Sequence, residues 1–244
     1  METVVIVGGS GDIGRHICFA AIEQGYDVLA IGRNADTLQM PELEGARLLT
    51  CDISCDDSIA TISAALENPV RAVIHGPGVD TAGGVLTAPI SAVIDAANIK
   101  VGGMMRLVRA CEDFFVEGTR LIGIGGHYGF EPTAYAATAG IGNAALANLI
   151  KQYSIAFGEK AVTAHLVAPG PADTERLHRV ANARAERAGQ SVDTVLAEML
   201  SESSIGEFTD VSAVAWAVMT LLSPHASAMT GSTLFLDAGR RRGI

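Results

Sequence analysis

Three glycines at three-residue spacing, Gly8, Gly11 and Gly14, lie between a run of apolar residues, Val4–Val7, and a segment with helical periodicity that begins at Asp12. The free N–H groups and the positive dipole end of a helix can hold a pyrophosphate when no side chains obstruct its approach. The pattern therefore predicts a strand, a phosphate-binding turn and a helix. The residues expected to contact the phosphates are Gly8, Ser10, Gly11, Asp12, Ile13 and Gly14.

The spacing Gly-x-x-Gly-x-x-Gly differs from the Gly-x-Gly-x-x-Gly of the common dinucleotide fingerprint. We therefore interpret it as a related turn with a geometry of its own. Taken alone, the motif is also compatible with a tight strand-to-helix turn that binds nothing. The elements along the rest of the chain have to distinguish these two interpretations.

Short apolar bursts recur along the chain, and segments of helical periodicity separate nearly all of them. This alternation predicts an α/β fold with a doubly wound parallel sheet of about seven strands and helices on both faces. The crossovers should be right-handed, and a ligand should bind beyond the carboxyl ends of the strands. The bursts are Val4–Val7, Val28–Ile31, Arg47–Cys51, Val70–Ile74, Arg120–Ile124, Ala161–Val167 and Thr233–Leu236.

Small or polar residues follow most of these bursts, and parallel strands would bring them to one edge of the sheet. A single crevice at this edge is the predicted ligand site. The clusters are Gly8-Gly9-Ser10, Gly32-Arg33-Asn34, Cys51-Asp52, His75-Gly76-Pro77-Gly78, Gly125-Gly126-His127 and Ala168-Pro169-Gly170.

Composition narrows the function classes. The 244 residues predict a single domain over 1–244. The net charge of −10, with only 17 Lys and Arg residues, argues against nucleic acid and acidic membranes as partners. We expect the short basic run at residues 240–242 to be a solvated tail, with a contact to a neighbouring subunit as the alternative.

The four cysteines lie at irregular spacing without a C-x-x-C pair, which predicts neither a disulfide framework nor a metal site. The chain begins with a strand pattern instead of a leader, and no apolar run reaches membrane-spanning length. We therefore expect a cytoplasmic protein.

The order of the motifs from Thr3 to Gly239 resembles the short-chain dehydrogenase/reductase family. The resemblance implies a Rossmann-type fold, a nicotinamide cofactor and a small-molecule substrate. Besides the glycine turn it rests on Asp52 after the third strand, Gly76-Pro77-Gly78 after the fourth, Asn98 in Asn-Ile-Lys-Val-Gly, Tyr135 in Ala-Tyr-Ala-Ala-Thr-Ala, the loop Pro169–Thr174, and Leu236-Asp237-Ala238-Gly239.

The same resemblance assigns further cofactor contacts. Asp52 and Ile53 would lie near the adenine, and Gly76 and Pro77 belong to the loop after the fourth strand, where the family usually carries Asn-Asn-Ala-Gly. The loop that closes over the nicotinamide supplies Pro169, Gly170, Ala172 and Thr174.

The end of the second strand bears on the choice between NADP(H) and NAD(H). An acidic side chain there would bind the adenosine ribose and repel a 2′-phosphate. This chain has Gly32 at that position, followed by Arg33, whose guanidinium suits a phosphate, and Asn34, which can add a donor. We therefore expect NADP(H), although Arg33 can also point into solvent.

The predicted catalytic site departs from its family. The family uses a Ser and a Tyr to polarise the carbonyl, and a Lys one helical turn past the Tyr. By this resemblance, the chain keeps the family's Asn and Tyr as Asn98 and Tyr135. It has Gly126 at the Ser position and Ala139 at the Lys position. A positioned proton donor contributes about 10²–10⁴-fold to the rate and an oxyanion-hole donor about 10²–10³-fold. Losing both should impair reduction of an ordinary ketone.

Three interpretations remain open. In the first, His127 and Tyr128 replace the missing groups, since an imidazole with a pKa of about 6.5 suits proton transfer, although the same pair can simply cap the strand and pack under a lid. In the second, the substrate is a quinone or conjugated aromatic ketone that needs little acid. In the third, the chain binds NADP(H) without redox turnover, as a sensor, a scaffold or a non-redox enzyme. We favour an NADP(H)-dependent oxidoreductase acting on a bulky apolar or aromatic carbonyl or a quinone.

Two segments bear on substrate access and assembly. Residues 171–207 are helical and charged, at the place where the family inserts its substrate lid. The segment Thr138–Gly158 is rich in small residues, and Ala88–Glu117 is a long stretch predicted to be helical. Members of the family commonly pair these two helices across a dyad, so we expect a homodimer or homotetramer.

Overall fold

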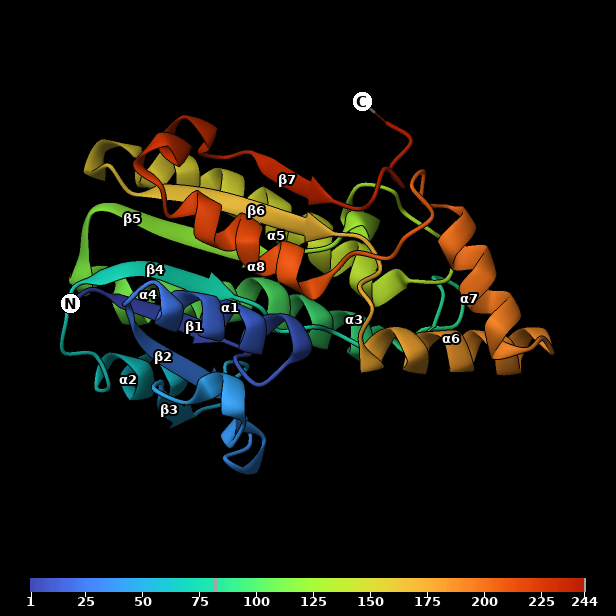
Figure 1. The fold of residues 1–244 in the computed structure, drawn as a ribbon, viewed down its shortest axis with the longest axis horizontal. Coiled ribbons are helices and arrows are strands. Elements are labelled where there is room, and N and C mark those ends of the chain that lie inside the picture. Colours follow the sequence, from blue (N-terminus) through green and yellow to red (C-terminus); the bar gives the residue numbers. More distant parts are fainter. Residues whose placement is uncertain (81–82, 244) are drawn as a thin grey trace.

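The computed structural model describes residues 1–80 and 83–243. Seven parallel strands form one sheet in the order β3-β2-β1-β4-β5-β6-β7, with helices on both faces (Figure 1). The predicted doubly wound α/β fold is therefore confirmed. The strands are β1 (Thr3–Val7), β2 (Asp27–Gly32), β3 (Arg47–Thr50), β4 (Val70–His75), β5 (Phe115–Ile124), β6 (Thr163–Pro169) and β7 (Thr233–Leu236).

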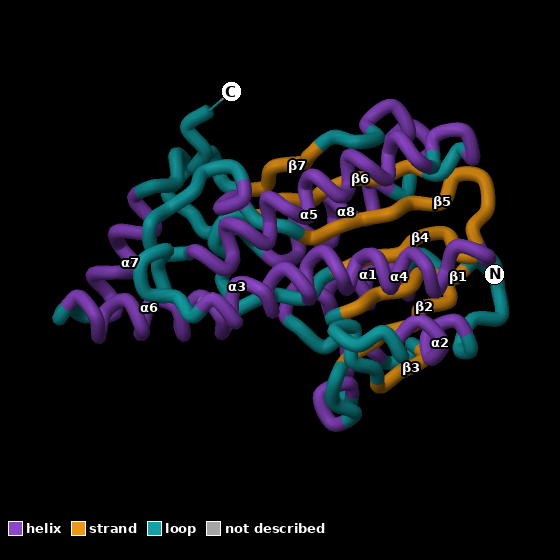
Figure 2. Tube along the Cα trace, turned by 180° about the vertical axis from the view of Figure 1, so that it is seen from behind, coloured by secondary structure: helices purple, strands orange, loops and turns teal. Residues whose placement is uncertain are grey.

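The helices form two layers and one projection. Helices α1 (Asp12–Glu23) and α8 (Val211–Leu221) cover one face of the sheet, and α2 (Ser58–Ser63), α4 (Gly103–Cys111) and α5 (Ala137–Ala156) cover the other. Helix α3 (Ile90–Ala97) packs beside α5. Helices α6 (Glu175–Ala188) and α7 (Val192–Ser201) extend beyond the carboxyl ends of the strands (Figure 2).

Strand β1 illustrates why the strands read as unbroken apolar runs. Val4 and Ile6 pack toward α1 and α8, whereas Val5 and Val7 pack toward α4 and α5. Both faces of a parallel sheet are buried, so apolar side chains are needed at every position and not at alternate ones. Strand β1 also lies between β2 and β4, where the strand order reverses, and this places the glycine turn at the crevice.

The predicted long helix over Ala88–Glu117 is wrong in its extent. A π-helical turn, Asn98–Gly102, separates α3 from α4, and the helix ends at Cys111. Strand β5 then begins at Phe115, where that residue pairs with Val70, and the register shifts before the next pair. Gly118 allows this irregularity because it adopts a φ of +85°.

The expectation of a solvated basic tail is also wrong, at Arg240. This side chain is buried and donates hydrogen bonds to Glu202 Oε2, at 2.6 Å, and to the carbonyl of Met199. Arg241 stacks on the ring of Phe235 at 3.9 Å. The carboxyl-terminal segment is therefore attached to the end of α7.

Three further features of the described residues bear on membranes, metal ions and disulfide bonds. Their helices do not include one with the length and apolar composition needed to cross a membrane. Within residues 1–80 and 83–243, no group of three or more His, Cys, Asp or Glu side chains is arranged to hold a metal ion. All four cysteines are free thiols.

Candidate active site

The glycine turn after β1 has the shape of a phosphate cradle. Gly8 adopts a φ of +85°, and its carbonyl accepts a hydrogen bond from Gly11 N at 3.0 Å. A Cβ at Gly14 would overlap the Gly8 carbonyl oxygen. Among the described residues no side chain caps α1 at Gly11, so the first N–H groups of the helix stay free for a ligand. The turn therefore fits a dinucleotide pyrophosphate.

A cavity extends from this turn along the carboxyl ends of β1, β2, β3 and β4. It brings together most of the residues predicted to hold the adenosine half of the cofactor. Those lining it are Gly8, Ser10, Gly11, Gly32, Arg33, Asp52, Ile53, Gly76 and Pro77.

The cavity is lined by one acidic and one basic side chain, Asp52 and Arg33. Asp52 accepts hydrogen bonds from Ser54 N at 2.9 Å and Ser54 Oγ at 2.8 Å, and these bonds lower the pKa of its carboxyl. Arg33 and Arg106 lower it further. Asp52 is therefore ionised at neutral pH, while the exposed Arg33 offers a cation at the end of β2.

Three of the predicted cofactor residues, Asp12, Gly14 and Asn34, line neither this cavity nor the one beyond the ends of β5 and β6. Asp12 pairs with Arg15 at 3.1 Å, and the side-chain oxygen of Asn34 accepts a hydrogen bond from Asp36 N at 2.9 Å. Gly14 serves the close packing of the turn.

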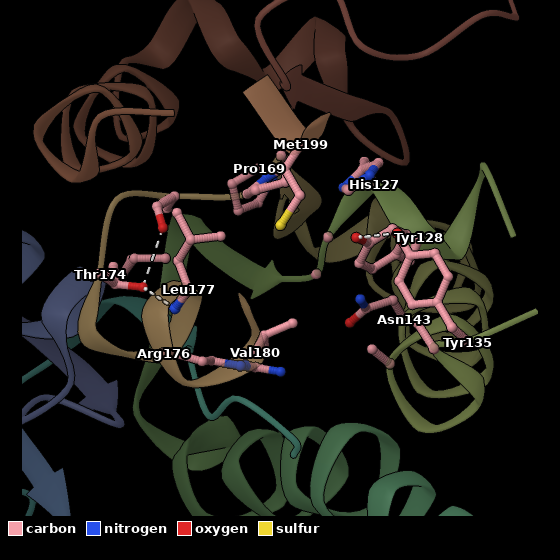
Figure 3. Close-up of a pocket in the computed structure, with 18 residues that line it drawn as sticks. His127, Tyr128, Tyr135, Asn143, Pro169, Thr174, Arg176, Leu177, Val180 and Met199 are labelled. Carbon is pink, nitrogen blue, oxygen red and sulfur yellow. Dashed lines mark hydrogen bonds between the residues drawn. The ribbon is translucent and has the colours of Figure 1, made fainter. Parts of the chain in front are cut away.

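A second cavity, of about 160 Å³, lies beyond the ends of β5 and β6, under α6 and α7 (Figure 3). It contains three of the four predicted catalytic side chains and the predicted nicotinamide loop. Ile13 reaches it from the glycine turn. The predicted residues lining it are Ile13, His127, Tyr128, Tyr135, Pro169, Gly170, Ala172 and Thr174.

The hydroxyl groups of Tyr128 and Tyr135 are hydrogen-bonded at 2.9 Å. Their rings pack edge to face with centroids 5.8 Å apart. Burial, together with the neighbouring Tyr135, raises the pKa of Tyr128 well above its usual range, so Tyr128 stays protonated. One hydroxyl of the pair donates to the other, which leaves one O–H group to donate elsewhere.

Asn143, which the sequence reasoning missed, lies against Gly126, the residue that the resemblance assigns to the family's serine position. A Cβ at Gly126 would lie 2.8 Å from Asn143 Nδ2. Asn143 is buried and lines the cavity, and its Oδ1 has no hydrogen-bond partner among the described residues. The available signal was periodicity, because Asn143 lies one helical turn past Ala139 on the same face of α5.

His127 stacks against Tyr128, with ring centroids 4.1 Å apart. Burial, helped by Arg240, lowers the pKa of His127 to about 4 against the opposing effect of nearby carboxylates. The ring is therefore a neutral imidazole at pH 7. It can polarise a carbonyl through a hydrogen bond, but not as a cation.

Asn98 does not point into the cavity. Its side-chain amide donates to the carbonyl of Ser54 at 3.0 Å. Asn98 is the first residue of the π-helical turn, an irregularity that is frequent at functional sites. Lys100 of the same turn is buried, and its Nζ donates to the carbonyl of Ile124 at 2.9 Å. Burial lowers the pKa of Lys100 to about 7. Neither side chain is among the residues that line the cavity.

Arg176 stands between the two cavities. It donates a hydrogen bond to the carbonyl of Val79, and a Cβ at Gly78 would overlap its guanidinium. The side chain comes from the first turn of α6, which Thr174 caps by accepting from Leu177 N at 3.3 Å. Helix α6 therefore spans the crevice and contacts the loop after β4.

The projecting helices have their own apolar contacts. Leu177 and Ala181 of α6 pack against Val195 and Met199 of α7. Leu177, Val180 and Met199 also face the cavity, on the side opposite Tyr135 and Asn143 (Figure 3). This small cluster places an apolar cover over the site.

The fold, the glycine cradle and the cavity around Tyr135 define a member of the short-chain dehydrogenase/reductase family of oxidoreductases. A family model described as enoyl-(acyl carrier protein) reductase matches residues 9–241. The chain therefore belongs to the short-chain dehydrogenase/reductase family.

Individual proteins show the same relationship at low identity. The chain is 24% identical to the short-chain reductase protein NovJ of Streptomyces niveus, over 98% of this chain and 94% of that one. The structure of YwfH, an NADPH dependent reductase involved in bacilysin biosynthesis, superposes with a TM-score of 0.89 at 20% identity, covering 100% of this chain and 99% of the other. An NAD+-bound xylitol dehydrogenase also gives 0.89, at 18% identity, with 96% and 97% covered.

The neutral state of His127 predicts a pH effect on stability. Because its pKa is lower in the folded chain, the unfolded chain binds a proton between about pH 6.5 and pH 4 that the folded chain refuses, so stability falls with falling pH. Between pH 7 and pH 5 the wild type should lose about 1–2 kcal/mol more free energy of unfolding than His127→Gln. Urea unfolding of both proteins at both pH values measures this difference, and equal losses would show that His127 is not held neutral.

Proposed function

We propose that this protein is an NADP(H)-dependent reductase in which Asn143 and the Tyr128–Tyr135 pair replace the family's usual catalytic set. The observation that carries the proposal is the amide of Asn143 at the serine position, in the same cavity as the hydrogen-bonded tyrosines. Amide and phenol groups are both suitable donors to a carbonyl oxygen that gains negative charge.

The roles of the residues follow from their positions. When bound, the reduced nicotinamide supplies a hydride to the carbonyl carbon. Asn143 Nδ2 and the hydroxyl of Tyr135 then donate to the carbonyl oxygen, and Tyr135 releases its proton to that oxygen. Tyr128 stays protonated, and its hydroxyl donates to the Tyr135 oxygen at 2.9 Å, which stabilises the negative charge left there until a proton from water restores Tyr135.

Two guanidinium groups supply positive charge in the absence of a lysine at position 139. The Arg184 guanidinium carbon lies 4.7 Å from the centroid of the Tyr135 ring. Arg176 lines the same cavity from the other side. Cations beside a phenol stabilise the negative charge that develops as its proton leaves, which is part of what the missing lysine would do.

The shape and lining of the cavity support a bulky apolar or aromatic carbonyl compound, or a quinone, as substrate. Leu177, Val180 and Met199 present apolar side chains toward Asn143 and Tyr135. We further propose that residues 171–207 form a lid, since α6 and α7 carry these three side chains.

NADP(H) is the proposed cofactor because of the residues at the end of β2. Gly32 provides no carboxylate to bind the ribose, and Arg33 lines the adenosine cavity with an exposed guanidinium. The NADPH dependence of the similar reductase YwfH is consistent with this preference, while the similar xylitol dehydrogenase binds NAD+.

We also propose that the chain forms a homodimer or homotetramer through α3 and α5. These helices pack closely, with a Cβ at Gly142 falling 3.6 Å from the carbonyl oxygen of Ala96. Both expose large apolar side chains, Ile94 with 62% and Ile141 with 48% of their surface accessible. An apolar face formed by two adjacent helices is suited to a second copy of itself.

The free cysteines support a reducing, cytoplasmic location.

Replacing the proposed carbonyl donor should lower activity without affecting cofactor binding. For Asn143→Ala we expect kcat/KM for an aromatic ketone to fall about 10²–10³-fold, the usual loss for one oxyanion donor. NADPH affinity should be unchanged, and the loss with a quinone should be smaller because its reduced form delocalises the charge. NADPH absorbance across a panel of ketones and quinones measures these rates.

Asn148→Ala is the matched control, because Asn148 lies on the same helix and is exposed. It should retain wild-type rates. Wild-type rates in Asn143→Ala would exclude the amide from catalysis, and NADPH binding without turnover on the whole panel would refute the reductase assignment.

The cofactor preference should depend on Arg33. Removing a charge-assisted contact to the 2′-phosphate in Arg33→Ala should weaken NADPH binding about 10-fold or more. NADH binding should stay as it is, since it has no phosphate at that position. Calorimetric titration of both cofactors tests this, and tighter binding of NADH by the wild type would contradict the preference.

Assembly should depend on the apolar face of α3 and α5. Ile94→Asp combined with Ile141→Asp should dissociate the oligomer, because each carboxylate would be buried against the partner copy. Phe19→Asp, on the exposed side of α1, is a control on the other face of the sheet and should leave the oligomer intact. Light scattering after size exclusion gives the mass of each, and a monomeric wild type would refute assembly.

A further inference from the structure

A third hollow lies beside the active site, on the outer side of Tyr135. It shares Tyr135, Arg176 and Val180 with the catalytic cavity. Its lining is dominated by the arginines of α6, Arg176, Arg179, Arg184 and Arg187, together with Asp80.

Four arginines in one hollow are unusual for this chain. Its 17 basic residues are outnumbered by 27 acidic ones, yet only Asp80 opposes the four guanidinium groups here. The spacing of the arginines along α6, at i, i+3, i+8 and i+11, places them on one side of the helix. Like charges so placed repel one another, so the arrangement is unfavourable until an anion joins it.

The arginines are also poorly paired. Arg179 meets Glu175 only at 3.8 Å, and both side chains are mostly exposed. In the described ranges no carboxylate lies within 4.0 Å of Arg184 or Arg187. The Nη1 atom of Arg184 is buried without a hydrogen-bond partner among those residues. An unpaired buried donor is costly, which indicates that its acceptor is supplied by a ligand.

The position of Arg184 links this hollow to the chemistry. Its guanidinium lies over the ring of Tyr135 at 4.7 Å, while the hydroxyl of Tyr135 is bonded to Tyr128 in the catalytic cavity. One phenol therefore separates the two spaces. A ligand that fills both would place its polar end among the arginines and its reacting end beside the tyrosine pair.

We propose that the hollow lined by Arg176, Arg184 and Arg187 binds an anionic group of the substrate, a carboxylate or a phosphate, while the carbonyl occupies the cavity beside Tyr135 and Asn143. The proposal refines the proposed reductase function and rests on it for the carbonyl. Guanidinium groups bind both anions through paired hydrogen bonds. The substrate class is thus an aromatic or apolar carbonyl compound with an acidic group at its other end.

Binding of three matched ketones tests the proposal directly. Calorimetry of the full-length protein with NADP+ would compare 4-acetylbenzoate, its uncharged methyl ester and 4-acetylphenyl phosphate. We expect one or both anions to bind about 10-fold or more tightly than the ester, and to lose this advantage at high salt. The tighter of the two anions identifies the charged group that the hollow prefers. Equal binding of the ester and the anions, or failure of both anions to bind, would overturn the proposal.

Substitutions locate the effect. Arg184→Gln and Arg187→Gln should each weaken anion binding about 10-fold, and Arg187→Gln, which alters no group beside the carbonyl, should leave ester binding unchanged. Arg187 is exposed, so its variant remains informative if Arg184→Gln does not fold. Arg109→Gln removes one exposed arginine from α4 and should bind the anions like the wild type. Wild-type anion binding by both α6 variants, or an equal loss in Arg109→Gln, would contradict the proposal.

The two proposals fail separately in this design. Selective anion binding without oxidation of NADPH by any ketone or quinone would refute the reductase function and retain the anion site. Turnover of the ester and the acids with equal kcat/KM would retain the reductase function and refute the anion site.

Discussion

Close contact between Gly126 and Asn143 shapes the cavity that also contains Tyr128 and Tyr135. Because Gly126 has no side chain, the amide of Asn143 reaches the end of β5, where a Cβ would lie only 2.8 Å from it. The proposed carbonyl donor is then carried by α5, which begins just after Tyr135. Two donors on or next to one helix keep a fixed separation, which is the kind of rigid support that an active site requires.

The cationic side of the site is arranged differently. Its charges come from α6, which is joined to the core through the Pro169–Thr174 loop and is covered by α7. Arg176 contacts the loop after β4, and Arg184 contacts Tyr135, so two side chains of α6 reach the crevice from different turns of the helix. In the proposed function, the carbonyl donors therefore lie on the rigid core and the anion-binding arginines on a peripheral helix.

The fold could be predicted because its signals are local. Each strand is an apolar run, and the glycine turn has the residue types that a close backbone approach demands, as the contact between Gly14 and Gly8 shows. Most predicted cofactor residues line the adenosine cavity for the same reason. The end of α4 was mispredicted because Phe115 and Val116 suit a strand or a helix equally, and pairing with Val70 decides between them.

The lining of the candidate site could be predicted only in part, since it depends on contacts between distant segments. Tyr135, Tyr128 and His127 were found through their places in the motifs, but Asn143 looks like an ordinary helical residue until the fold brings it to Gly126. Asn98 was expected in the site and instead bonds to Ser54. Arg240 was expected in solvent, although its partners on α7 lie about forty positions earlier, a separation that periodicity does not register.

Attachment of the chain end to α7 gives the cover of the site a mechanical restraint. The carbonyl of Ala238 accepts hydrogen bonds from Ser203 Oγ and Ser204 N, and Arg240 holds Glu202. Helix α7 cannot swing outward without breaking these bonds or drawing the last residues after β7 along with it. Loss of residues 238–240 would therefore act at a distance, as a loosened hinge over the cavity that contains Tyr135.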